Sequence, residues 1–412
     1  MVAAVGGASV GSYLFNLIAI RWLGAGDYGE VAALTSLGLL VSLPLAAIQN
    51  AVGRDVAALS AGGHSGAVAA LFRRWLARMA ATGVLLGAAT AACTGSIQEH
   101  LAIDSRLSVW LTAAAIAAAT VLPVGHGMLQ GLQRFRWLAA SILVWAFARP
   151  LLAPPLILLG GVDGAMAATA VAALVPLVIS GVAIRRVVGK LPASGAAPRR
   201  TRGAPLWPVL LGVTGFAVLT NVDVIVAKAA LSAYDAGNYA SAALVGKAVL
   251  FAATGIALVL LPRATAYLVT DHAALKRAVG RSLVTVSALG LAAATLLLPV
   301  PASAVVWLFG PTFGQARELL VPFALAMTPG AVAHVLLTTA LAAADRRYPV
   351  VLALVAVADV GALWLVGGSA QGILAVTAAS CVVAVIAYEA VASWPLRTLL
   401  QRETAVQYQG GS

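Results

Sequence analysis

Charged residues are scarce in this chain: they make up 10% of its 412 residues, whereas hydrophobic residues make up 61%. A soluble domain carries about 25% charged residues. No soluble core of this size hides so much apolar surface, so the bilayer is the expected solvent. The start of the chain also lacks a basic segment and a clear cleavage site, so we expect a first spanning helix there rather than a signal peptide.

Several patterns of catalytic and metal-binding proteins are missing as well. The two cysteines, Cys93 and Cys381, lie in apolar runs without CxxC or His/Cys spacing, which argues against a disulfide framework or a zinc site. The five histidines form no HExxH pattern, and His126 is expected to be a satisfied residue near a helix end. No GxxxxGK[ST] loop is present, so direct use of ATP is not expected. We therefore expect no metal and no cofactor.

The sequence contains twelve apolar segments separated by short polar loops. A spanning helix needs about 20 mostly apolar residues. The predicted fold is an all-α polytopic membrane protein with about twelve transmembrane helices. The predicted spans are 2–23, 28–52, 75–96, 107–129, 137–159, 163–184, 206–229, 237–262, 282–302, 318–343, 349–367 and 371–394.

The loops between these spans differ in charge. Twenty of the 26 lysines and arginines lie in one alternate set, and only Arg21, Arg106 and Arg317 lie in the other set, together with seven acidic residues. The positive-inside rule then places the N- and C-termini in the cytoplasm. A basic surface that faces anionic lipid also accounts for the net charge of +12 without a nucleic-acid partner.

One pattern occurs twice. Asn16, four apolar residues and Arg21 precede a turn and Tyr28, and Asp223, four apolar residues and Lys228 precede a turn and Tyr239. The repeat predicts two six-helix halves related by a pseudo-two-fold axis along the membrane normal. The predicted parts are the halves 1–184 and 206–394, a basic cytoplasmic linker 185–205 and a cytoplasmic tail 395–412.

A basic segment follows the second span of each predicted half. Leu71-Phe72-Arg73-Arg74 follows in the first half, and Leu275-Lys276-Arg277 follows in the second. Both segments are candidates for amphipathic helices that lie on the membrane surface. The alternative is that any short inner loop collects arginines.

Several segments resemble one family of membrane proteins. Gly127-Met-Leu-Gln130-Gly131-Leu-Gln133-Arg134-Phe135 resembles the GxLQGxxRF segment of the Wzx-type polysaccharide and lipid-linked oligosaccharide flippases. These belong to the multidrug/oligosaccharidyl-lipid/polysaccharide exporter superfamily. Arg21-Trp-Leu-Gly24-Ala-Gly-Asp-Tyr28-Gly29 is similar to the RxLGxxxYG of that family, and Leu308-Phe-Gly310 to its ninth-to-tenth connection. The resemblance covers nearly the whole chain, although no strict set of substrate-binding residues transfers with it.

The resemblance implies a flippase, not an enzyme. It would move a polyprenyl-diphosphate-linked oligosaccharide or polysaccharide precursor from the inner to the outer leaflet of the bacterial plasma membrane by alternating access. The implied partners are the lipid-linked glycan, membrane lipids and polysaccharide-assembly proteins.

Ionisable residues inside predicted spans are the candidate site. Such residues cost several kcal/mol at mid-bilayer unless they face protein, water or a partner. Arg149 and Lys247, near the midplane and from opposite halves, are predicted cavity cations for a diphosphate, because arginine and lysine both bind phosphate. Asp223, Asp359 and Glu389 are predicted cavity or coupling groups for H+ or Na+, and Asn16 is a further polar candidate. Mutual pairing of these charges to fix helix packing is the structural alternative.

Other features near the spans have more ordinary interpretations. Lys228 and Arg21 are expected to extend to the outer headgroups. Eight prolines are expected to interrupt or kink helices: Pro44, Pro123, Pro150, Pro154, Pro155, Pro262, Pro322 and Pro329. Each such kink would permit, but not require, a rocking motion of the spans.

Two other functions fit the sequence less well than a flippase. A cation-coupled antiporter of drugs or small molecules belongs to the same superfamily, but it would favour an anionic cavity. A membrane enzyme of polysaccharide assembly would need a long outer catalytic loop, and every outer connection in this sequence is short.

Overall fold

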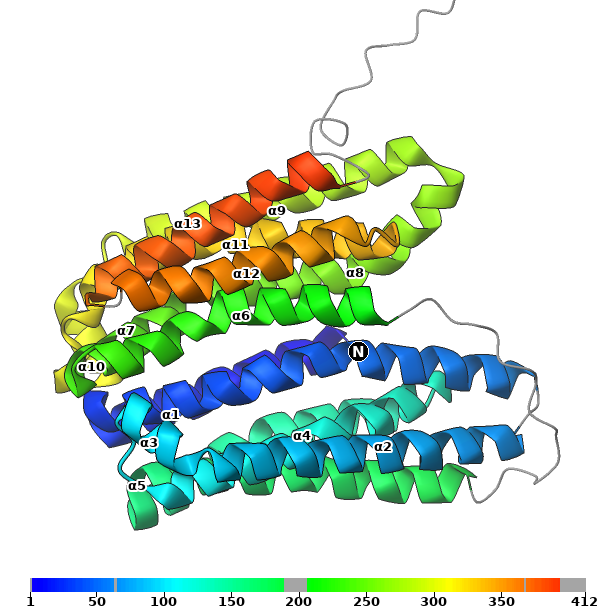
Figure 1. The fold of residues 1–412 in the computed structure, drawn as a ribbon, viewed down its shortest axis with the longest axis horizontal. Helices are drawn as coiled ribbons and strands as arrows, with labels where there is room; N and C mark the ends of the chain where they lie inside the picture. The colour runs from blue at the N-terminus through cyan, green and yellow to red at the C-terminus, as the bar shows by residue number, and fades with distance from the viewer. Residues whose placement is uncertain (1, 63–64, 189–205, 367, 393–412) are drawn as a thin grey trace, which may run out of the picture.

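The computed structural model describes residues 2–62, 65–188, 206–366 and 368–392. Within these ranges the chain forms thirteen α-helices and one short 3-10 helix (Figure 1). They are α1 (Val2–Ala61), α2 (Ser65–Ala92), α3 (Thr94–Leu101), α4 (Arg106–Gly131), α5 (Phe135–Val188), α6 (Trp207–Ala230), α7 (Ala233–Gly246), α8 (Ala248–Thr270), α9 (His272–Leu297), α10 (Ala302–Phe309), η1 (Pro311–Phe313), α11 (Ala316–Ala342), α12 (Arg347–Val366) and α13 (Ala370–Val391).

Ten of the described helical segments are long and apolar enough to cross a membrane, so the chain is a multi-pass membrane protein. Two of the helices are too long for one crossing. α1 has 60 residues and α5 has 54, which correspond to about 90 Å and about 80 Å at 1.5 Å per residue, against a hydrocarbon core of about 30 Å. Each contains a sharp turn with non-helical backbone, at Gly24 in α1 and at Gly160 and Gly161 in α5. Ten helices therefore accommodate the twelve predicted apolar segments.

The helices form two groups along the chain. α1 to α5 pack on one another and are named the N-terminal bundle, and α6 to α13 pack on one another and are named the C-terminal bundle (Figure 1). α1 makes the main connection between them, because it packs against α6 and α7. The largest apolar core contains residues of both bundles, such as Phe15, Tyr28, Tyr239 and Phe313.

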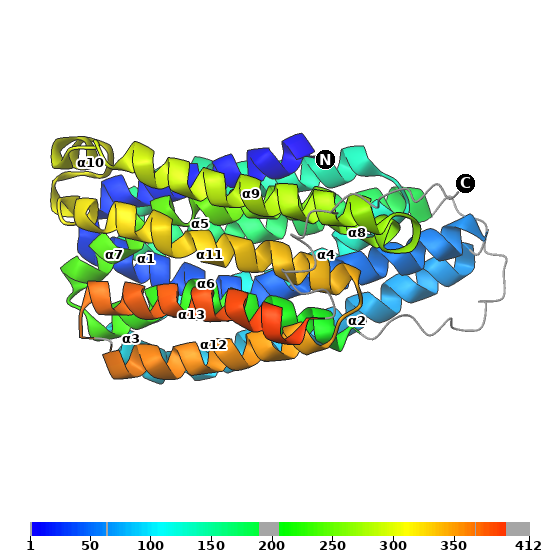
Figure 2. The same cartoon turned by 90° about the horizontal axis from the view of Figure 1, so that it is seen from above.

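The bundle has two distinct ends. The end that carries α3, α10 and the start of α7 is named the α10 end (Figures 1 and 2). The opposite end, where α2 begins and α8 joins α9, is named the basic end, since the first half of α2 contains Arg73 and Arg74 and the first two turns of α9 contain Lys276 and Arg277. Residues 189–205 of the predicted linker and residues 395–412 of the predicted tail lie outside the described residues, so those domain boundaries stay predictions.

The predicted surface helices do not exist as separate elements. Leu71 to Arg74 lie within α2, and Leu275 to Arg277 lie within the first turns of α9. No proline or turn signal separates either basic segment from the apolar run after it, and a helix satisfies its own backbone hydrogen bonds both in water and in lipid. The basic segments therefore continue the spanning helices beyond the apolar layer.

The prolines were predicted to interrupt helices, but the helices continue through them. Pro44 lies inside α1, Pro123 inside α4, and Pro150, Pro154 and Pro155 inside α5. The breaks fall instead at Gly24 and Gly161, where φ is +76° and +54°, values that only glycine adopts at little cost. A milder break lies at Lys247, inside the predicted segment 237–262, where α7 ends and α8 begins while the backbone keeps right-handed helical angles (φ −71°, ψ −5°).

The GxLQGxxRF-like segment has a clear packing role. Gly127 and Gly131 of α4 face the second part of α1, where an added Cβ at Gly131 would come within 2.7 Å of the Cβ of Val56. Close approach through small residues is the usual way that helices pack in membranes. Between the glycines, the Gln130 Oε1 accepts a hydrogen bond of 3.1 Å from the Gln49 Nε2. The segment therefore joins α4 to α1.

Candidate functional site

The two copies of the repeated sequence pattern make the same contact. The Tyr28 hydroxyl donates to the Asn16 Oδ1 over 3.2 Å, and the Tyr239 hydroxyl donates to the Asp223 Oδ2 over 3.2 Å. Both tyrosines are fully buried. The copies differ in the acceptor, which is a neutral amide in α1 and an acid in α6.

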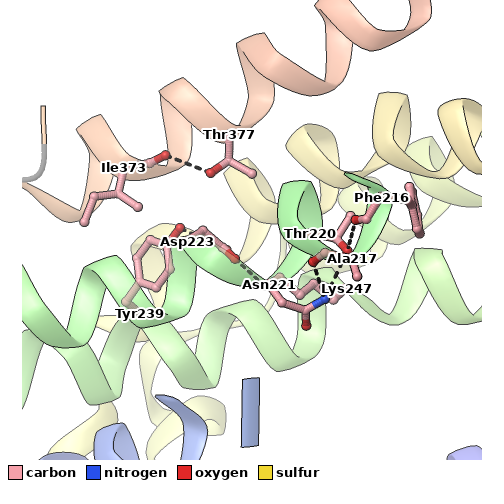
Figure 3. Close-up of polar contacts among 9 residues, drawn as sticks. All are labelled: Phe216, Ala217, Thr220, Asn221, Asp223, Tyr239, Lys247, Ile373 and Thr377. Atoms are coloured by element: carbon pink, nitrogen blue, oxygen red, sulfur yellow. Dashed lines mark hydrogen bonds and ion pairs between the residues drawn. The ribbon is translucent and has the colours of Figure 1, made fainter. Parts of the chain in front are cut away.

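The acid in α6 has a cationic partner. The Lys247 Nζ lies 2.7 Å from the Asp223 Oδ1, and Asp223 is only 1% exposed (Figure 3). Lys247 occupies the break between α7 and α8, and its own amide donates to the Ala243 carbonyl. The ion pair therefore ties α6 to a helix break. The pairing alternative from the sequence holds for these two residues.

Asp359 on α12 is a second buried acid near this pair. It is 1% exposed, and neither carboxylate oxygen accepts a hydrogen bond of normal geometry within the described part of the chain. Ser380 of α13 and Asp223 lie within electrostatic range of its carboxyl group. A buried carboxyl group without full hydrogen bonding is costly as an anion.

Arg149 on α5 is a buried cation in the N-terminal bundle. It is 8% exposed, and its guanidinium carbon lies 3.9 Å from the ring centroid of Phe15. The Nη2 donates to the Thr169 hydroxyl over 3.2 Å, while the Nε has no partner. No carboxylate of the described residues forms an ion pair with it, so stacking on an aromatic ring is its main compensation.

The predicted site residues form two clusters and one outlier. Asp223, Lys247 and Asp359 gather in the C-terminal bundle. Arg149 and Asn16 gather in the N-terminal bundle, where both lie beside Tyr28. Glu389 does not join either cluster, because it is half-buried one turn from the end of α13, beside Tyr388 at the basic end. These placements leave the functional roles as predictions.

The sequence interpretation of Lys228 is wrong. Its side chain does not extend to the headgroups but is buried, and its Nζ lies 3.7 Å from the Oε1 of Glu30 in α1. The pair joins the two bundles, and only the contact between α1 and α6 brings the residues together. Glu30 lies at the start of the predicted span 28–52, and its partner is almost two hundred residues away in the sequence, so no local signal indicated the pair.

Further contacts close the α10 end. The Arg21 guanidinium donates to the Trp307 carbonyl over 2.5 Å, and the Ala25 amide donates to the Thr312 hydroxyl over 3.2 Å. Aromatic packing of Tyr28 on Phe313 adds to this seal. Apart from a contact of Tyr13 in the middle of the bundle, the hydrogen bonds between the bundles in the described ranges all lie at this end.

Two small surface depressions are also present. One, of about 520 Å³, is lined by Arg346, Arg347 and apolar residues of α12 and α13. The other, of about 350 Å³, lies between α1 and α10 around Arg21, Trp22 and Trp307. Neither contains a residue of the two clusters. No group of three metal-ligating side chains occurs among the residues that the structure describes.

Comparison with solved structures places the fold. No family model matches the chain, and no curated protein matches it. An inward-facing multidrug resistance MATE family transporter of the MOP superfamily is similar with a TM-score of 0.77, at 14% identity over 91% of this chain and 92% of that chain. An outward-facing transporter of the same description gives a TM-score of 0.60, at 17% identity over 93% of each chain.

A third neighbour is a MOP superfamily transporter from Pyrococcus furiosus, for which a reverse polarity of the binding pocket suggests a different function. Its TM-score is 0.59, at 15% identity over 93% of each chain. The chain therefore has the fold of the MATE transporters of the MOP superfamily. This agrees with the superfamily part of the sequence resemblance.

Proposed function

We propose that this protein is an alternating-access transporter that flips a polyprenyl-diphosphate-linked glycan to the outer leaflet of a bacterial plasma membrane. The glycan diphosphate would bind at Arg149 while the lipid tail stays in the bilayer. Two bundles related by a pseudo-two-fold axis along the membrane normal would rock about this site. The basic end would face the cytoplasm, in keeping with the positive-inside rule.

The unpaired charge of Arg149 carries the proposal. Of the buried cations described above, Lys228 is neutralised by Glu30 and Lys247 by Asp223, whereas Arg149 has only Phe15 and Thr169. A cation buried without a counterion favours an anionic ligand, and the guanidinium fork suits a phosphate. Asn16 and Tyr28, on the same side of the site, add neutral hydrogen-bonding groups.

The conformation supports an inward-facing resting state. The α10 end is sealed by Arg21, Ala25 and the Glu30–Lys228 pair, and the fold matches the inward-facing neighbour with a higher TM-score than the outward-facing one. A flippase that loads its substrate from the inner leaflet needs such a state. The reverse polarity of the binding pocket described for the Pyrococcus furiosus neighbour is a precedent for a different function on this fold.

The two acids of the C-terminal bundle supply the coupling in this proposal. Asp223 and Asp359 are buried within electrostatic range of each other, and only Asp223 has a cation beside it. Binding of H+ or Na+ to this pair of acids would remove their repulsion and change the charge balance at Lys247. Transport would then depend on a gradient of that ion.

Reconstitution into liposomes tests the anion site. Arg149→Ala should slow the flipping of a polyprenyl-diphosphate-linked sugar by at least about tenfold, because a hydrogen bond to a charged group contributes about 1.5–3 kcal/mol. Arg149→Lys should retain part of the rate. Arg136→Ala is the matched control, since Arg136 is exposed on the same helix. Wild-type flipping by Arg149→Ala at normal protein level would disprove the assignment.

A cation-coupled drug antiporter is the second candidate, and one observation favours it. Asp359 is a buried acid that forms no ion pair with a cation among the described residues, and such an acid can hold a cationic drug as well as a coupling ion. In that case Asp359→Asn would abolish the efflux of a cationic dye such as ethidium, whereas Arg149→Ala would leave it intact. The flippase proposal expects no gradient-driven efflux of ethidium from the wild-type protein.

A further inference from the structure

A single turn of α1 contacts both clusters. The ring of Phe15 stacks on the Arg149 guanidinium, and Asn16 accepts a hydrogen bond from the Tyr28 hydroxyl. Two residues of the turn therefore belong to the cluster around Arg149 in the N-terminal bundle. Tyr13, in the same turn, reaches the other bundle: its hydroxyl donates to the Leu244 carbonyl over 3.0 Å. Its ring packs edge-on against Phe251 of α8, with 5.6 Å between the centroids.

The contact of Tyr13 lies at the break between α7 and α8. Leu244 is in the last turn of α7, and Phe251 is in the first turn of α8, so Tyr13 contacts the helices on both sides of Lys247. The other hydrogen bonds between the bundles in the described residues lie at the α10 end. Tyr13 is therefore placed to follow a change in the geometry of this break.

The same break is held from the other side by Asp223. The Asp223 carboxylate forms an ion pair with Lys247 and accepts a hydrogen bond from the Tyr239 hydroxyl. Asp359 and Cys381 lie within electrostatic range of it. When a cation binds between the acids Asp223 and Asp359, the attraction of Asp223 for Lys247 falls, because part of the negative charge that balanced the ammonium group is compensated. A lysine left unpaired inside the membrane must move to a more polar position, and the α7–α8 junction moves with it.

We propose that Tyr13 is a positioning residue that couples the two clusters: it transmits the state of the Asp223–Lys247 pair to the anion site at Arg149. A shift of Leu244 and Phe251 displaces Tyr13, and Tyr13 carries Phe15 and Asn16 with it on one helical turn. The turn at Gly24 leaves this first part of α1 separate from the second part. The inference rests on the proposed function, since it assumes an anion at Arg149 and a cation at Asp223.

The coupling is measured as a change in affinity. Farnesyl diphosphate, as a short probe, is titrated into the full-length protein in lipid nanodiscs, in sodium and in choline buffer and at acidic and alkaline pH. Coupling energies between sites are usually equivalent to about 5–150-fold in affinity. The affinity of the wild-type protein for the probe should change by a factor in this range between sodium and choline buffer or between acidic and alkaline pH. Tyr13→Phe should still bind the probe, but its affinity should vary by less than about twofold across the conditions.

Tyr234→Phe is the matched control. Tyr234 lies on α7, as does Leu244, but its side chain is exposed, so removal of its hydroxyl should leave the wild-type dependence unchanged. A merely structural role of Tyr13 would lower thermal stability or affinity equally in all buffers. Retention of the full cation dependence in Tyr13→Phe would overturn the inference.

A second measurement separates this inference from the proposed function. Spin labels on Arg73→Cys and Arg277→Cys, in a protein with Cys93 and Cys381 replaced by alanine, report the distance between the bundles at the basic end. If the probe does not bind but the wild-type distance changes with pH or sodium, the anion site fails, and loss of that change in Tyr13→Phe still supports the link. If neither the affinity nor the distance of the wild-type protein responds to the cation, the coupling by Tyr13 is disproved.

Discussion

An ammonium group inside a bilayer needs a counter-charge, and Lys247 has Asp223 at 2.7 Å. The pair lies between apolar helices, where both charges have lost most of their hydration. Breaking such a buried pair from one side costs far more than replacing both partners, because one charge is left without compensation.

This asymmetry gives a stability prediction. Lys247→Met should lower the free energy of unfolding by about 3–5 kcal/mol, whereas Asp223→Asn with Lys247→Met should recover most of the loss. Thermal unfolding of the purified protein in detergent measures both. Equal stability of the single and double variants would contradict the prediction. Both variants should lose the gradient dependence of transport.

Asp359 leads to a prediction about coupling rather than stability. It has no full set of hydrogen bonds to lose, so Asp359→Asn should leave thermal stability within about 1 kcal/mol of wild type. The same change should remove the dependence of transport on the H+ or Na+ gradient if Asp359 holds the coupling ion. Transport into liposomes with imposed gradients measures this, and Glu389→Gln is a control because Glu389 lies away from the cluster. An unchanged gradient dependence in Asp359→Asn would exclude it as the coupling site.

At the residue scale the sequence indicated which charges matter but not how they pair. Depth in an apolar segment identified Arg149, Lys247, Asp223 and Asp359, and all four are buried or partly buried. The partners depend on packing between segments far apart in the chain. The likeness of Asn16 to Asp223 was visible in the sequence, but the matching tyrosine hydrogen bonds needed the structure.

Helices follow directly from the apolar segments, because a backbone in lipid must satisfy its own hydrogen bonds. The turns at Gly24 and Gly161 fall where glycine allows a positive φ, and both coincide with predicted connections between spans. The break at Lys247 was not predicted. Its signal is a lysine within an apolar run, and the contacts of Asp223 and Tyr13 that hold the break come from other helices.

The packing of α4 on α1 gives a prediction at this scale. Gly131→Ala should destabilise the protein by about 1–3 kcal/mol, because the new Cβ would overlap Val56 and the Gly53 carbonyl. Gly181→Ala is the control, since no atom lies within 4 Å of the Cβ position there. Thermal unfolding of the two variants compares them directly. An effect at Gly181 as large as that at Gly131 would show that helix propensity, and not packing, decides.

For the whole molecule, the seal at the α10 end is the feature that the proposed alternating-access cycle would have to break. In a protein with Cys93 and Cys381 replaced by alanine, Ala25→Cys with Thr312→Cys should form a disulfide, because the Ala25 amide contacts the Thr312 side chain. We expect the oxidised protein to bind substrate from the basic end but not to transport it, and reduction should restore transport. Transport at the wild-type rate in the oxidised, fully cross-linked protein would rule out opening at this end.

The buried pair of Glu30 and Lys228 should contribute to the same seal. Glu30→Gln with Lys228→Met removes both charges while keeping similar volume, so the fold should remain intact. We expect this variant to populate the outward-open state more than wild type, seen as increased labelling of a cysteine placed at Thr312. No change in labelling would show that the pair serves packing alone.

The overall architecture was the part that the sequence predicted best. The alternation of apolar segments with charged loops predicted a polytopic helical protein, and the structure has ten helical segments of the required length within its described residues. The motifs resembled those of a superfamily whose fold the structure shares. The contact between the bundles could not be predicted, because it brings together α1, α6 and α7, which lie far apart in the sequence.

The tight turns in α1 and α5 have a consequence for how the chain enters the membrane. At Gly24 and at Gly160–Gly161 the connection between the two helical parts is only one or two residues long. Such a short connection favours entry of both parts into the bilayer together. We therefore expect each long helix to insert as a helical hairpin, and in the proposed orientation the charges of Arg21 and Asp27 cross the membrane together at the tip of α1. During biosynthesis these two hairpins are the natural units of insertion, and a stop between their arms would leave an apolar segment stranded.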